Sequence, residues 1–470
     1  MKKTKIIATI SNKMCDIPLL EQMFAAGMNV VRMNTAHQTP EEALKVVQNV
    51  RAVSDRIALM IDTKGPEIRI TEMDKEIPVK SGDILSIKGN KNESSSNECL
   101  FVNYDDFVHD MSLGDKILID DGEIELCVVD KKSDALTCEV LNDGAIKSRK
   151  GVNLPSVKIK NLPALSEKDR TFIEFAAEHN VDFIAHSFVR RKEDVLAIQE
   201  ILDAKKSQVK IIAKIENQEG VDNIDEIIDH CFGVMVARGD LAIEIPAERI
   251  PIIQKGLVRK CIERRKPVII ATQMLQSMVN SPRPTRAEVS DVANACLDHT
   301  DAIMLSGETA NGKYPVEAVQ MMTKIAVEVE SSLSTFIDTS YESENDVTGY
   351  LSKAAVKSAL RLSTKALIAD TISGKTILSL AAYRGENMIY AFCYSKRVMR
   401  ELALSFGVHA YYMRPDLTSH EFLKAALTHL LAEDRFDEDS LITVLAGNFG
   451  SNTGASYVEI STAKNLLKRK

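Results

Sequence analysis

Several features are missing from this 470-residue sequence. It contains no tryptophan, an absence that carries no information about the fold, and aromatic residues make up only 5% of the chain. No apolar stretch approaches the ~20 residues that a transmembrane helix requires, so we expect no membrane span. An excess of positive charge is missing too, because the net charge is -8 and the isoelectric point about 5.7. This acidic balance argues against nucleic acid or an anionic membrane as a general partner.

Paired cysteines and a targeting segment are also missing. The eight cysteines are scattered and include no Cys-x-x-Cys pair, so reduced thiols in a cytosolic protein explain them better than zinc ligands or disulfides. The N-terminal Met1-Lys2-Lys3 is basic, but only a few apolar residues follow it and there is no cleavage pattern. We therefore predict a cytoplasmic protein without a signal peptide. Its length predicts two or three domains.

What the chain does have is a repeated alternation of strand and helix patterns. Eight short apolar runs are typical of buried parallel strands: Lys5–Ile10, Asn29–Met33, Ala58–Ile61, Asp182–Ala185, Val209–Ala213, Gly233–Ala237, Pro267–Ala271 and Asp301–Leu305. Helical patterns follow most of them: Pro18–Ala26, Glu41–Val53, Glu167–His179, Glu193–Lys205, Ala247–Arg265, Arg286–Leu297 and Pro315–Glu330. Eight such units predict an α/β fold built on a (β/α)8 TIM barrel, formed by residues 1–67 and 160–335.

Polar residues gather where the predicted strands end. In a (β/α)8 barrel the catalytic groups lie at the carboxyl ends of the strands. The polar residues at those ends here are Arg32, Asn34, Asp62, Lys64, Ser187, Lys214, Glu216, Asp240, Thr272, Ser306 and Glu308. The strands themselves are apolar, and packing alone does not readily explain why so many polar residues stand at their ends. We therefore predict an active site at the carboxyl end of the barrel.

Two triplets at neighbouring strand ends carry the most specific chemistry. Lys214-Ile215-Glu216 ends one apolar run, and Arg238-Gly239-Asp240 ends the next. Residues two apart in a strand share a face, so Lys214 and Glu216 are expected to point the same way. Two carboxylates on neighbouring strand ends suit Mg2+, and a lysine beside them suits an anionic substrate. These residues alone leave open the alternative of a structural ion pair followed by a turn.

Two segments interrupt the barrel pattern. Residues 68–159 contain short alternating segments and turn signals, which predict an inserted small antiparallel β-barrel that can act as a lid over the catalytic end. Within it, Asp121-Gly122 is interpreted as a hairpin turn rather than a ligand. The polar, acidic stretch Ser331–Gly349 is interpreted as a linker. Residues 346–470 are predicted to form a separate α/β regulatory domain, with strands at Ala366–Asp370, Met388–Phe392, Val408–Met413 and Leu441–Ala446.

Long motifs that resemble those of the pyruvate kinase family run through the whole chain. The segment Ile211–Val221 is similar to that family's signature around its active-site lysine. The other similar segments are Asp62–Arg69, Lys150–Pro155, Met235–Leu241, Ala271–Leu275, Pro282–Glu288 and Met304–Thr309. Several long motifs in the family's order form a very specific signal. The resemblance implies a kinase that transfers the phosphoryl group of phosphoenolpyruvate to ADP, giving pyruvate and ATP in the last step of glycolysis.

The resemblance also implies roles in binding and turning over the substrate. Glu216 and Asp240 would hold Mg2+, while Lys214 and Arg32 would stabilise charge on the phosphoryl group in flight. Thr272 would contact the substrate carboxylate near the carbon that is protonated. The backbone expected to supply amide donors is that of Ala237, Arg238, Gly239 and Asp240. The proton donor is left open between Lys214 and water linked to Thr272, Ser306 and Glu308.

Fewer residues are implicated in binding the nucleotide. Arg69 would bind its phosphates, and His37 and Asn34 would also contact it, although an ordinary surface position is the alternative for His37. The chain has Ser11-Asn12 where the family usually has Gly-Pro, in a loop near the nucleotide, so nucleotide affinity or preference is affected. His186, where the family usually has a small residue, is interpreted as structural.

The family also uses a monovalent cation, usually K+. By resemblance its ligands would be Asn34, residue 36, Asp62 and the backbone of Thr63. Residue 36 is alanine here, where the family usually has serine, so one side-chain oxygen is missing. Glu67 matches the K+-dependent branch of the family. We therefore expect K+ dependence with a weaker affinity for K+.

The C-terminal region predicts a regulatory site. The segment Thr371–Thr376 follows a predicted strand and opens a helix, where hydroxyls, a glycine and free amides suit a phosphate. Related enzymes bind a sugar-phosphate effector at this loop, so the expected effector residues are Thr371, Ser373, Gly374, Lys375 and Thr376. An ordinary strand-to-helix turn is the alternative. The glycine-rich segment Gly447–Gly454 is expected to close over such a ligand.

Two other functions compete with this interpretation. One is a different Mg2+-dependent enolate enzyme on the same barrel, such as an aldolase or a lyase, which would need neither the inserted domain nor Arg69. The other is a non-catalytic relative that senses metabolites through its C-terminal domain, which only the changes at Ser11-Asn12 and Ala36 support. The presence of Arg32 and Lys214 argues against such a sensor. By resemblance alone, we expect a homotetramer.

Overall fold

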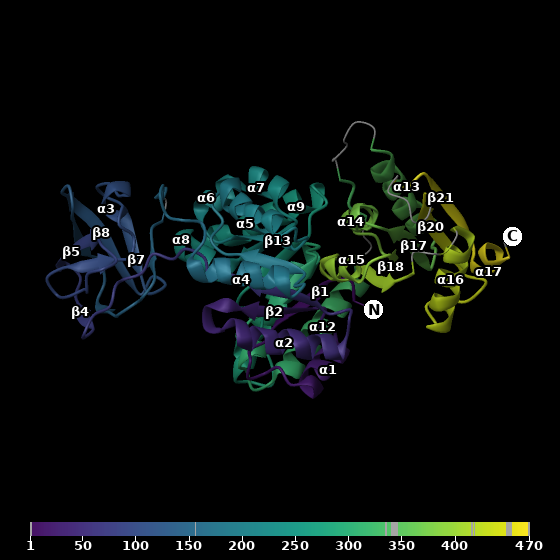
Figure 1. Ribbon diagram of the computed structural model, residues 1–470, viewed down its shortest axis with the longest axis horizontal. Coiled ribbons are helices and arrows are strands. Elements are labelled where there is room, and N and C mark those ends of the chain that lie inside the picture. The colour runs from purple at the N-terminus through teal and green to yellow at the C-terminus, as the bar shows by residue number, and fades with distance from the viewer. Residues whose placement is uncertain are drawn as a thin grey trace.

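The computed structural model describes residues 2–155, 157–333, 336–339, 346–414, 417, 419–447 and 454–468, without the side chains of residues 37, 419 and 420. The predicted linker Ser331–Gly349 therefore lies partly outside the described residues. Figure 1 shows three bodies in a row, with a β unit at one end, the barrel in the middle and an α/β unit at the other end. Among the described helices, none is long and apolar enough to cross a membrane.

Eight parallel strands close into a barrel in the order β1-β16-β15-β14-β13-β12-β3-β2. Their bounds are β1 Lys5–Thr9, β2 Val30–Asn34, β3 Ala58–Asp62, β12 Phe183–His186, β13 Lys210–Ile215, β14 Gly233–Ala237, β15 Val268–Ala271 and β16 Ala302–Leu305. The first and last of these strands pair, with Lys5 opposite Ala302, so the sheet has no edge. The predicted TIM barrel is confirmed, and each of its predicted strands is present.

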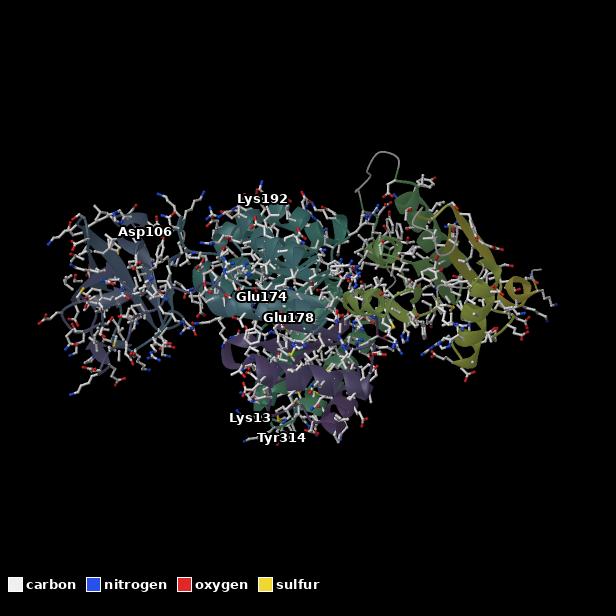
Figure 2. All side chains as sticks on the ribbon, viewed as in Figure 1. Lys13, Asp106, Glu174, Glu178, Lys192 and Tyr314 are labelled. Carbon is white, nitrogen blue, oxygen red and sulfur yellow. The ribbon has the colours of Figure 1, made fainter. Side chains whose placement is uncertain are left out.

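Helices cover the outside of the barrel. The larger ones are α1 Ile17–Ala26, α2 Pro40–Val53, α4 Glu167–Glu178, α5 Lys192–Ala204, α9 Ile250–Glu263, α10 Arg286–Leu297 and α12 Pro315–Ser331. Side-chain capping boxes begin α2, α4 and α10, which satisfies amide groups that a helix start leaves without a partner. Their outward faces are polar, as Glu174 and Glu178 of α4 and Lys192 of α5 illustrate in Figure 2. The predicted helix Ala247–Arg265 is divided, because a 3-10 turn at Ala247–Arg249 precedes α9.

The alternation of side chains along β13 explains where the predicted active-site lysine lies. Ile212 belongs to the cluster inside the barrel, whereas Ile211 and Ala213 belong to the layer between strands and helices. Lys214 follows Ile212 by two residues and therefore shares its inward face. Because Lys214 is near the end of the strand, its long side chain reaches the carboxyl mouth of the barrel.

The inserted unit is a curled β structure with its own apolar core. One sheet has the order β11-β7-β8-β9-β5-β6, and β4 pairs with β10. The bounds are β4 Ile77–Val79, β5 Ile84–Gly89, β6 Leu100–Val102, α3 Phe107–Asp110, β7 Lys116–Ile119, β8 Ile124–Lys131, β9 Leu136–Val140, β10 Gly144–Ile146 and β11 Val152–Asn153. The prediction of an entirely antiparallel insert is wrong in one place, because β5 and β6 are parallel. The interpretation of Asp121-Gly122 as a hairpin turn is confirmed: these residues join the antiparallel strands β7 and β8 with positive φ.

The C-terminal unit is a five-stranded sheet in the order β19-β18-β17-β20-β21, with an apolar cluster on each side. Its strands are β17 Ala366–Thr371, β18 Ile389–Cys393, β19 Val408–Tyr412, β20 Leu441–Ala446 and β21 Tyr457–Thr462. Its helices are α13 Val347–Arg361, α14 Lys375–Ala382, α15 Lys396–Glu401, α16 Ser419–Ala432 and α17 Ala463–Leu467. The four predicted strands are confirmed and are parallel, whereas β21 is antiparallel and was not predicted.

A buried ion pair connects the barrel to the C-terminal unit. Arg384 donates to Asp301 at 2.5 Å, and the two side chains are only 2% and 3% exposed. Because removing one partner of a buried pair leaves an uncompensated charge, we expect Arg384→Met to lower the free energy of unfolding by ~3 kcal/mol or more. The matched control is Arg259→Met in the exposed pair with Glu263, which should cost less than about 0.5 kcal/mol. Urea unfolding of both variants measures this, and equal shifts would contradict it.

Candidate active site

Lys214 lies among three oxygen-bearing side chains at the carboxyl end of the barrel. Its ammonium is 3.0 Å from Asp62, 3.0 Å from Glu216 and 2.6 Å from the hydroxyl of Ser187. The prediction that Lys214 and Glu216 point the same way is confirmed. Burial would lower the pKa of Lys214, but Asp62 and Glu216 outweigh it and raise this pKa. The lysine is therefore a fixed positive charge at neutral pH.

Asp62 connects two of the predicted cationic residues. One of its oxygens accepts from Lys214, and the other accepts from Arg32 at 2.5 Å. Burial would raise the pKa of Asp62, but Arg32 and Lys214 together lower it, so this carboxylate stays ionised. Arg32 also donates to the hydroxyl of Thr9 at 3.0 Å. Side chains from four strands, β1, β2, β3 and β13, are thus fixed against one another.

Ser187 completes this network at the end of β12. Its hydroxyl donates to the carbonyl of Thr63 at 2.7 Å and lies 3.3 Å from Asp62. The backbone amide of Ser187 in turn donates to the hydroxyl of Thr63 at 3.0 Å. Ser187 was noted in the sequence only as a polar strand end, and no sequence signal placed its hydroxyl against Lys214. His186 beside it is buried, which lowers its pKa to about 4 and keeps the ring neutral.

Glu216 and Asp240 bring two carboxyl groups together. Asp240 lies in α8 Arg238–Glu244, just after β14, and is hydrogen-bonded to Glu216. Burial raises the pKa of Glu216 to about 7 and raises the pKa of Asp240. A pair of neighbouring carboxyl groups whose ionised forms are both disfavoured by burial is suited to a cation. Among the described residues, no group of three or more acidic, histidine or cysteine side chains is arranged so that it could hold a metal ion, so a metal held by Glu216 and Asp240 would take its other ligands from substrate or water.

The turn after β15 orients Thr272. Thr272 and Gln273 both have positive φ, 70° and 54°, a conformation that is uncommon for residues other than glycine. The Thr272 hydroxyl donates to the carbonyl of Ala271 at 2.6 Å and accepts from the amide of Gly239 at 2.8 Å. The turn therefore joins Thr272 to the α8 segment that carries Asp240.

Some polar groups near the site are already engaged. The Arg238 guanidinium binds both oxygens of Asp291, at 2.6 and 2.7 Å, so only the backbone of Arg238 remains for the predicted substrate contact. Glu308 accepts from the amides of Leu275 and Ser306, at 3.0 and 2.7 Å. Its two oxygens therefore support the turn after β15 and the start of α11 Gly307–Ala310.

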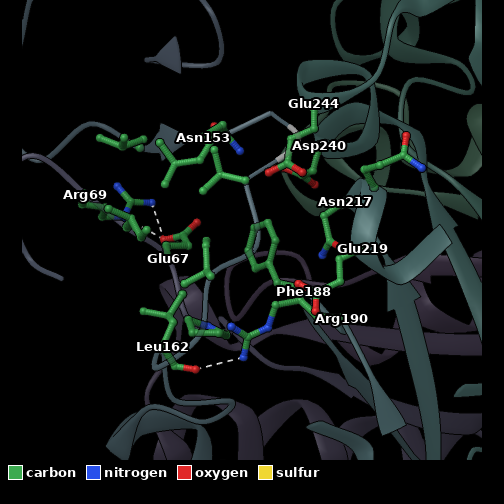
Figure 3. Close-up of a pocket in the computed structure, with 18 of the residues that line it drawn as sticks. Glu67, Arg69, Asn153, Leu162, Phe188, Arg190, Asn217, Glu219, Asp240 and Glu244 are labelled. Atoms are coloured by element: carbon green, nitrogen blue, oxygen red, sulfur yellow. Dashed lines mark hydrogen bonds and ion pairs between the residues drawn. The ribbon is translucent and has the colours of Figure 1, made fainter. Parts of the chain in front are cut away.

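A cavity of about 320 Å3 lies between the inserted unit and the barrel (Figure 3). Asp240 lines it from the barrel, and Glu67 and Arg69 line it from the chain that leads into the insert. Arg69 donates to Glu67 at 2.7 Å and to the carbonyl of Arg149 at 2.7 Å, which fixes its guanidinium at the cavity. Lys214 and Arg32 do not line this cavity, so Asp240 is the residue that it shares with the cluster around Lys214.

The structure adds residues that the sequence patterns did not identify. Glu244 of α8 lines the cavity, and its carboxyl is hydrogen-bonded to the side chain of Asn153 in the insert. Burial raises the pKa of Glu244 to about 7. Arg190 lines the same cavity, pairs with Asp194 and is fixed near Phe188 in Figure 3. Asn153 lies within the family motif Lys150–Pro155, so the sequence could have identified it as a site residue. No sequence pattern pointed to Glu244.

The remaining predicted ligands lie at the ends of β2 and β3. Asn34 is opposite Asp62 in the strand register, which brings the proposed K+ ligands together. The Asn34 side-chain oxygen accepts from the amide of Ala36 at 3.1 Å, and Lys168 donates to the carbonyl of Ala36 at 3.1 Å. The side chain of His37 lies outside the described residues.

This fold and site define an enzyme of the (β/α)8-barrel class, with two buried cationic side chains and three carboxyl groups at the carboxyl ends of its strands. The description "Pyruvate kinase, barrel domain" matches residues 1–319, and "Pyruvate kinase, alpha/beta domain" matches residues 350–460. The chain belongs to the pyruvate kinase family.

Individual relatives agree along nearly the full length. The pyruvate kinase of Borreliella burgdorferi is 46% identical over 473 residues, covering 99% of this chain and 98% of the relative. The pyruvate kinase of Geobacillus stearothermophilus is 44% identical, covering 100% of this chain and 81% of the relative. A crystal structure of a pyruvate kinase from Cryptosporidium parvum has a TM-score of 0.93 at 35% identity, covering 98% of this chain and 96% of that one.

Proposed function

We propose that this chain transfers the phosphoryl group of phosphoenolpyruvate to ADP, giving pyruvate and ATP, with Mg2+ and K+. The observation that carries the proposal is the network of Lys214, Asp62 and Glu216 at the carboxyl end of the barrel, with Asp240 beside it. Phosphoryl transfer needs charge neutralisation and alignment more than covalent catalysis. A buried ammonium and two carboxyl groups suited to a cation meet those needs.

Each residue of this network has a separate role in the proposed reaction. A Mg2+ ion held by Glu216 and Asp240 would neutralise negative charge on the substrate. Lys214 and Arg32 would place positive charge where the phosphoryl group passes, because Asp62 holds both side chains in position and Ser187 also holds Lys214. Backbone amides at the start of α8 would add donors, and Arg69 would bind the nucleotide phosphates from the insert side of the cavity. Asn34 and His37 remain proposed nucleotide contacts.

The structure bears on the open question of the proton donor. The raised pKa of Lys214 makes it a poor acid at neutral pH. Glu308 is occupied by two backbone amides. Water beside the Thr272 hydroxyl is therefore the source of the proton in our proposal.

The test of the function is pyruvate formation from phosphoenolpyruvate and ADP in the presence of Mg2+, with and without K+. We expect robust turnover that requires ADP. Pyruvate released without ADP would indicate a lyase on the same barrel. No turnover with any cation or sugar phosphate would favour the non-catalytic sensor.

We expect Ala36→Ser to lower the K+ concentration for half-maximal activity several-fold, because it restores a side-chain oxygen beside Asn34 and Asp62. The other candidate ligands are partly used within the protein, since the Thr63 carbonyl accepts from Ser187 and Asn34 caps Ala36. Activity titrated with KCl at constant ionic strength measures this. Ala52→Ser, on the exposed side of α2, is the control. An unchanged titration in Ala36→Ser, or no response to K+ at all, would contradict the proposed site.

The proposed effector site lies in the C-terminal unit. A cavity of about 390 Å3 is lined by Thr371, Ser373, Lys375 and Thr376, and Gly447 and Gly454 also line it. Gly374 begins α14 with a φ of 86°, and its amide donates to the Thr371 hydroxyl at 2.8 Å, which shapes the loop. Residues 448–453 of the predicted closing segment lie outside the described residues. We propose that a sugar phosphate binds here.

Lys375→Ala is expected to raise the concentration of a sugar-phosphate activator needed for half-maximal activation roughly tenfold or more, since a charge-assisted hydrogen bond to phosphate is lost. Fructose 1,6-bisphosphate is a suitable probe, titrated at a phosphoenolpyruvate concentration below KM. Lys365→Ala, exposed in the same unit but outside the cavity, is the control. An unchanged response in Lys375→Ala would remove this loop from the effector site.

The limits of the three domains, assembly into a homotetramer and a cytoplasmic location are part of the same proposal. They rest on the family and on the sequence pattern. Sedimentation velocity at micromolar concentration tests the assembly directly, with a tetramer as the expected species.

A further inference from the structure

Glu244 is the last residue of α8, the helix whose first turn carries Asp240. Residues four apart on a helix lie on the same face, and both carboxyl groups line the cavity of Figure 3. The proposed reaction assigns no role to Glu244. The groups that its half-buried carboxyl contacts therefore indicate what it does.

The carboxyl group of Glu244 contacts the inserted unit. It is hydrogen-bonded to the side chain of Asn153, which lies in β11 and lines the same cavity (Figure 3). The backbone around Asn153 is fixed within the insert, because Asn153 is opposite Leu118 of β7 in the strand register. The amide of its neighbour Val152 donates to the carbonyl of Ile68 at 2.8 Å. A movement of the insert relative to the barrel therefore changes the contact between Asn153 and Glu244.

The carboxyl group of Glu244 also contacts the segment that follows Glu216. It accepts from the backbone amide of Gln218, the first residue of α6. Asn217 lies between Glu216 and this helix and caps the helix with its side chain. Glu244 thus holds the end of α8 against the start of α6, and the carboxyl groups of Glu216 and Asp240 lie on these two segments.

The insert fixes the arginine that is proposed to bind the nucleotide phosphates. The Arg69 guanidinium donates to the carbonyl of Arg149 at 2.7 Å, and the Arg69 amide donates to the side chain of Asn103 at 2.7 Å. Both partners belong to the insert, so Arg69 keeps its place relative to Asn153. The contact between Asn153 and Glu244 therefore links the nucleotide side of the cavity to the segments that carry the two carboxyl groups.

We propose that Glu244 is a positioning residue, which aligns the inserted unit with Glu216 and Asp240 through its contact with Asn153. This inference rests on the proposed phosphoryl transfer, in which ADP bound by Arg69 meets the phosphoryl group on the barrel. Phosphoryl transfer depends on such alignment, and a misplacement of about 1 Å can cost roughly a hundredfold in rate. Glu244 acts through Asn153 rather than on a substrate.

The experiment compares Asn153→Ala, Glu244→Ala and the double variant in pyruvate formation from phosphoenolpyruvate and ADP. We expect each single variant to raise KM for ADP about tenfold, the effect of one lost hydrogen bond. KM for phosphoenolpyruvate should change less than about twofold, because the proposed contacts of this substrate are all on the barrel. The double variant should be no worse than Glu244→Ala, since both changes remove the same contact.

Glu244→Gln is the conservative variant. Its side-chain amide can still accept from Gln218 and pair with Asn153, so KM for ADP should stay within about twofold of the unchanged chain. Glu248→Ala is the matched control, because Glu248 lies in the next turn of the chain, is exposed and does not line the cavity. Its kcat and both KM values should be unchanged.

Calorimetric titration of the full chain with ADP in the presence of Mg2+ gives the same comparison without turnover. A failure of the proposed reaction is thereby distinguished from a failure of this inference. The dissociation constant for ADP should rise about tenfold in each single variant and no further in the double variant. If Glu244→Ala does not fold, Asn153→Ala with and without Glu244→Gln carries the test. Equal rises in KM for both substrates, additive effects in the double variant, or an unchanged ADP affinity in Asn153→Ala would overturn the proposal.

Discussion

Replacing Lys214 with methionine is expected to lower kcat by about three orders of magnitude or more. The substitution keeps most of the side-chain length and removes the charge that Asp62, Glu216 and Ser187 hold in place. A fixed positive group at the transferring phosphoryl typically contributes a factor of about 10³–10⁵ to kcat. Because this charge acts mainly in the transition state, KM for phosphoenolpyruvate should change much less than kcat.

The matched control is Lys210→Met, at the first residue of the same strand. Lys210 lies at the opposite end of β13, where its nearest acidic partner is Glu401 at 4.0 Å. Steady-state pyruvate formation and thermal unfolding of both variants separate a catalytic loss from a folding defect. A Lys214→Met variant that folds and keeps more than a tenth of the kcat would remove Lys214 from the proposed mechanism.

Glu216→Gln should weaken divalent-metal binding by at least ~10–100-fold and lower kcat with it. Glutamine has the same shape, and its amide oxygen can still accept from the amide of Phe188, which now donates to Glu216 at 2.6 Å. The variant therefore loses the negative charge beside Asp240 while the local backbone contact is kept. The readout is the affinity for Mn2+, a paramagnetic substitute for Mg2+, measured from the free-ion signal in electron paramagnetic resonance.

Glu219→Gln is the control for this second prediction. Glu219 lies in α6 Gln218–Asp222 and lines the cavity of Figure 3, but it has no ion pair with Lys214 in the described part of the chain. Its Mn2+ affinity and kcat should match those of the unchanged protein. If Glu216→Gln bound Mn2+ as tightly as this control, the pair Glu216 and Asp240 would not be the metal site.

The parts of the fold that follow from local pattern were predictable. Each barrel strand is an apolar run, and each polar residue at its end follows from where that run stops. The period of two residues along β13 was enough to place Lys214 and Glu216 on one face. The antiparallel β21 and the parallel pair of β5 and β6 were not predictable in this way, because the sequence of a strand carries no sign of the direction in which it pairs.

The same distinction applies within the site. The sequence showed which residue types stand at the strand ends, but it did not show which side chains or backbone groups they bind. Nothing near Arg238 in the sequence indicates that Asp291 binds its guanidinium. Likewise, Glu308 was a candidate for a proton relay until the structure showed that it accepts from two backbone amides. Such assignments depend on long-range geometry, which a strand or helix pattern does not encode.

The order in which the strands are joined has a consequence for folding during synthesis. Strand β1 is among the first residues made, yet its barrel neighbour β16 ends at Leu305. The inserted unit has its own apolar core, complete by about residue 160. A ribosome moving along the message therefore exposes a self-contained β unit well before the barrel can close, while β1 waits for β16 and β3 waits for β12. Until β16 has been made, the growing sheet keeps an open edge at β1 that a chaperone would have to protect.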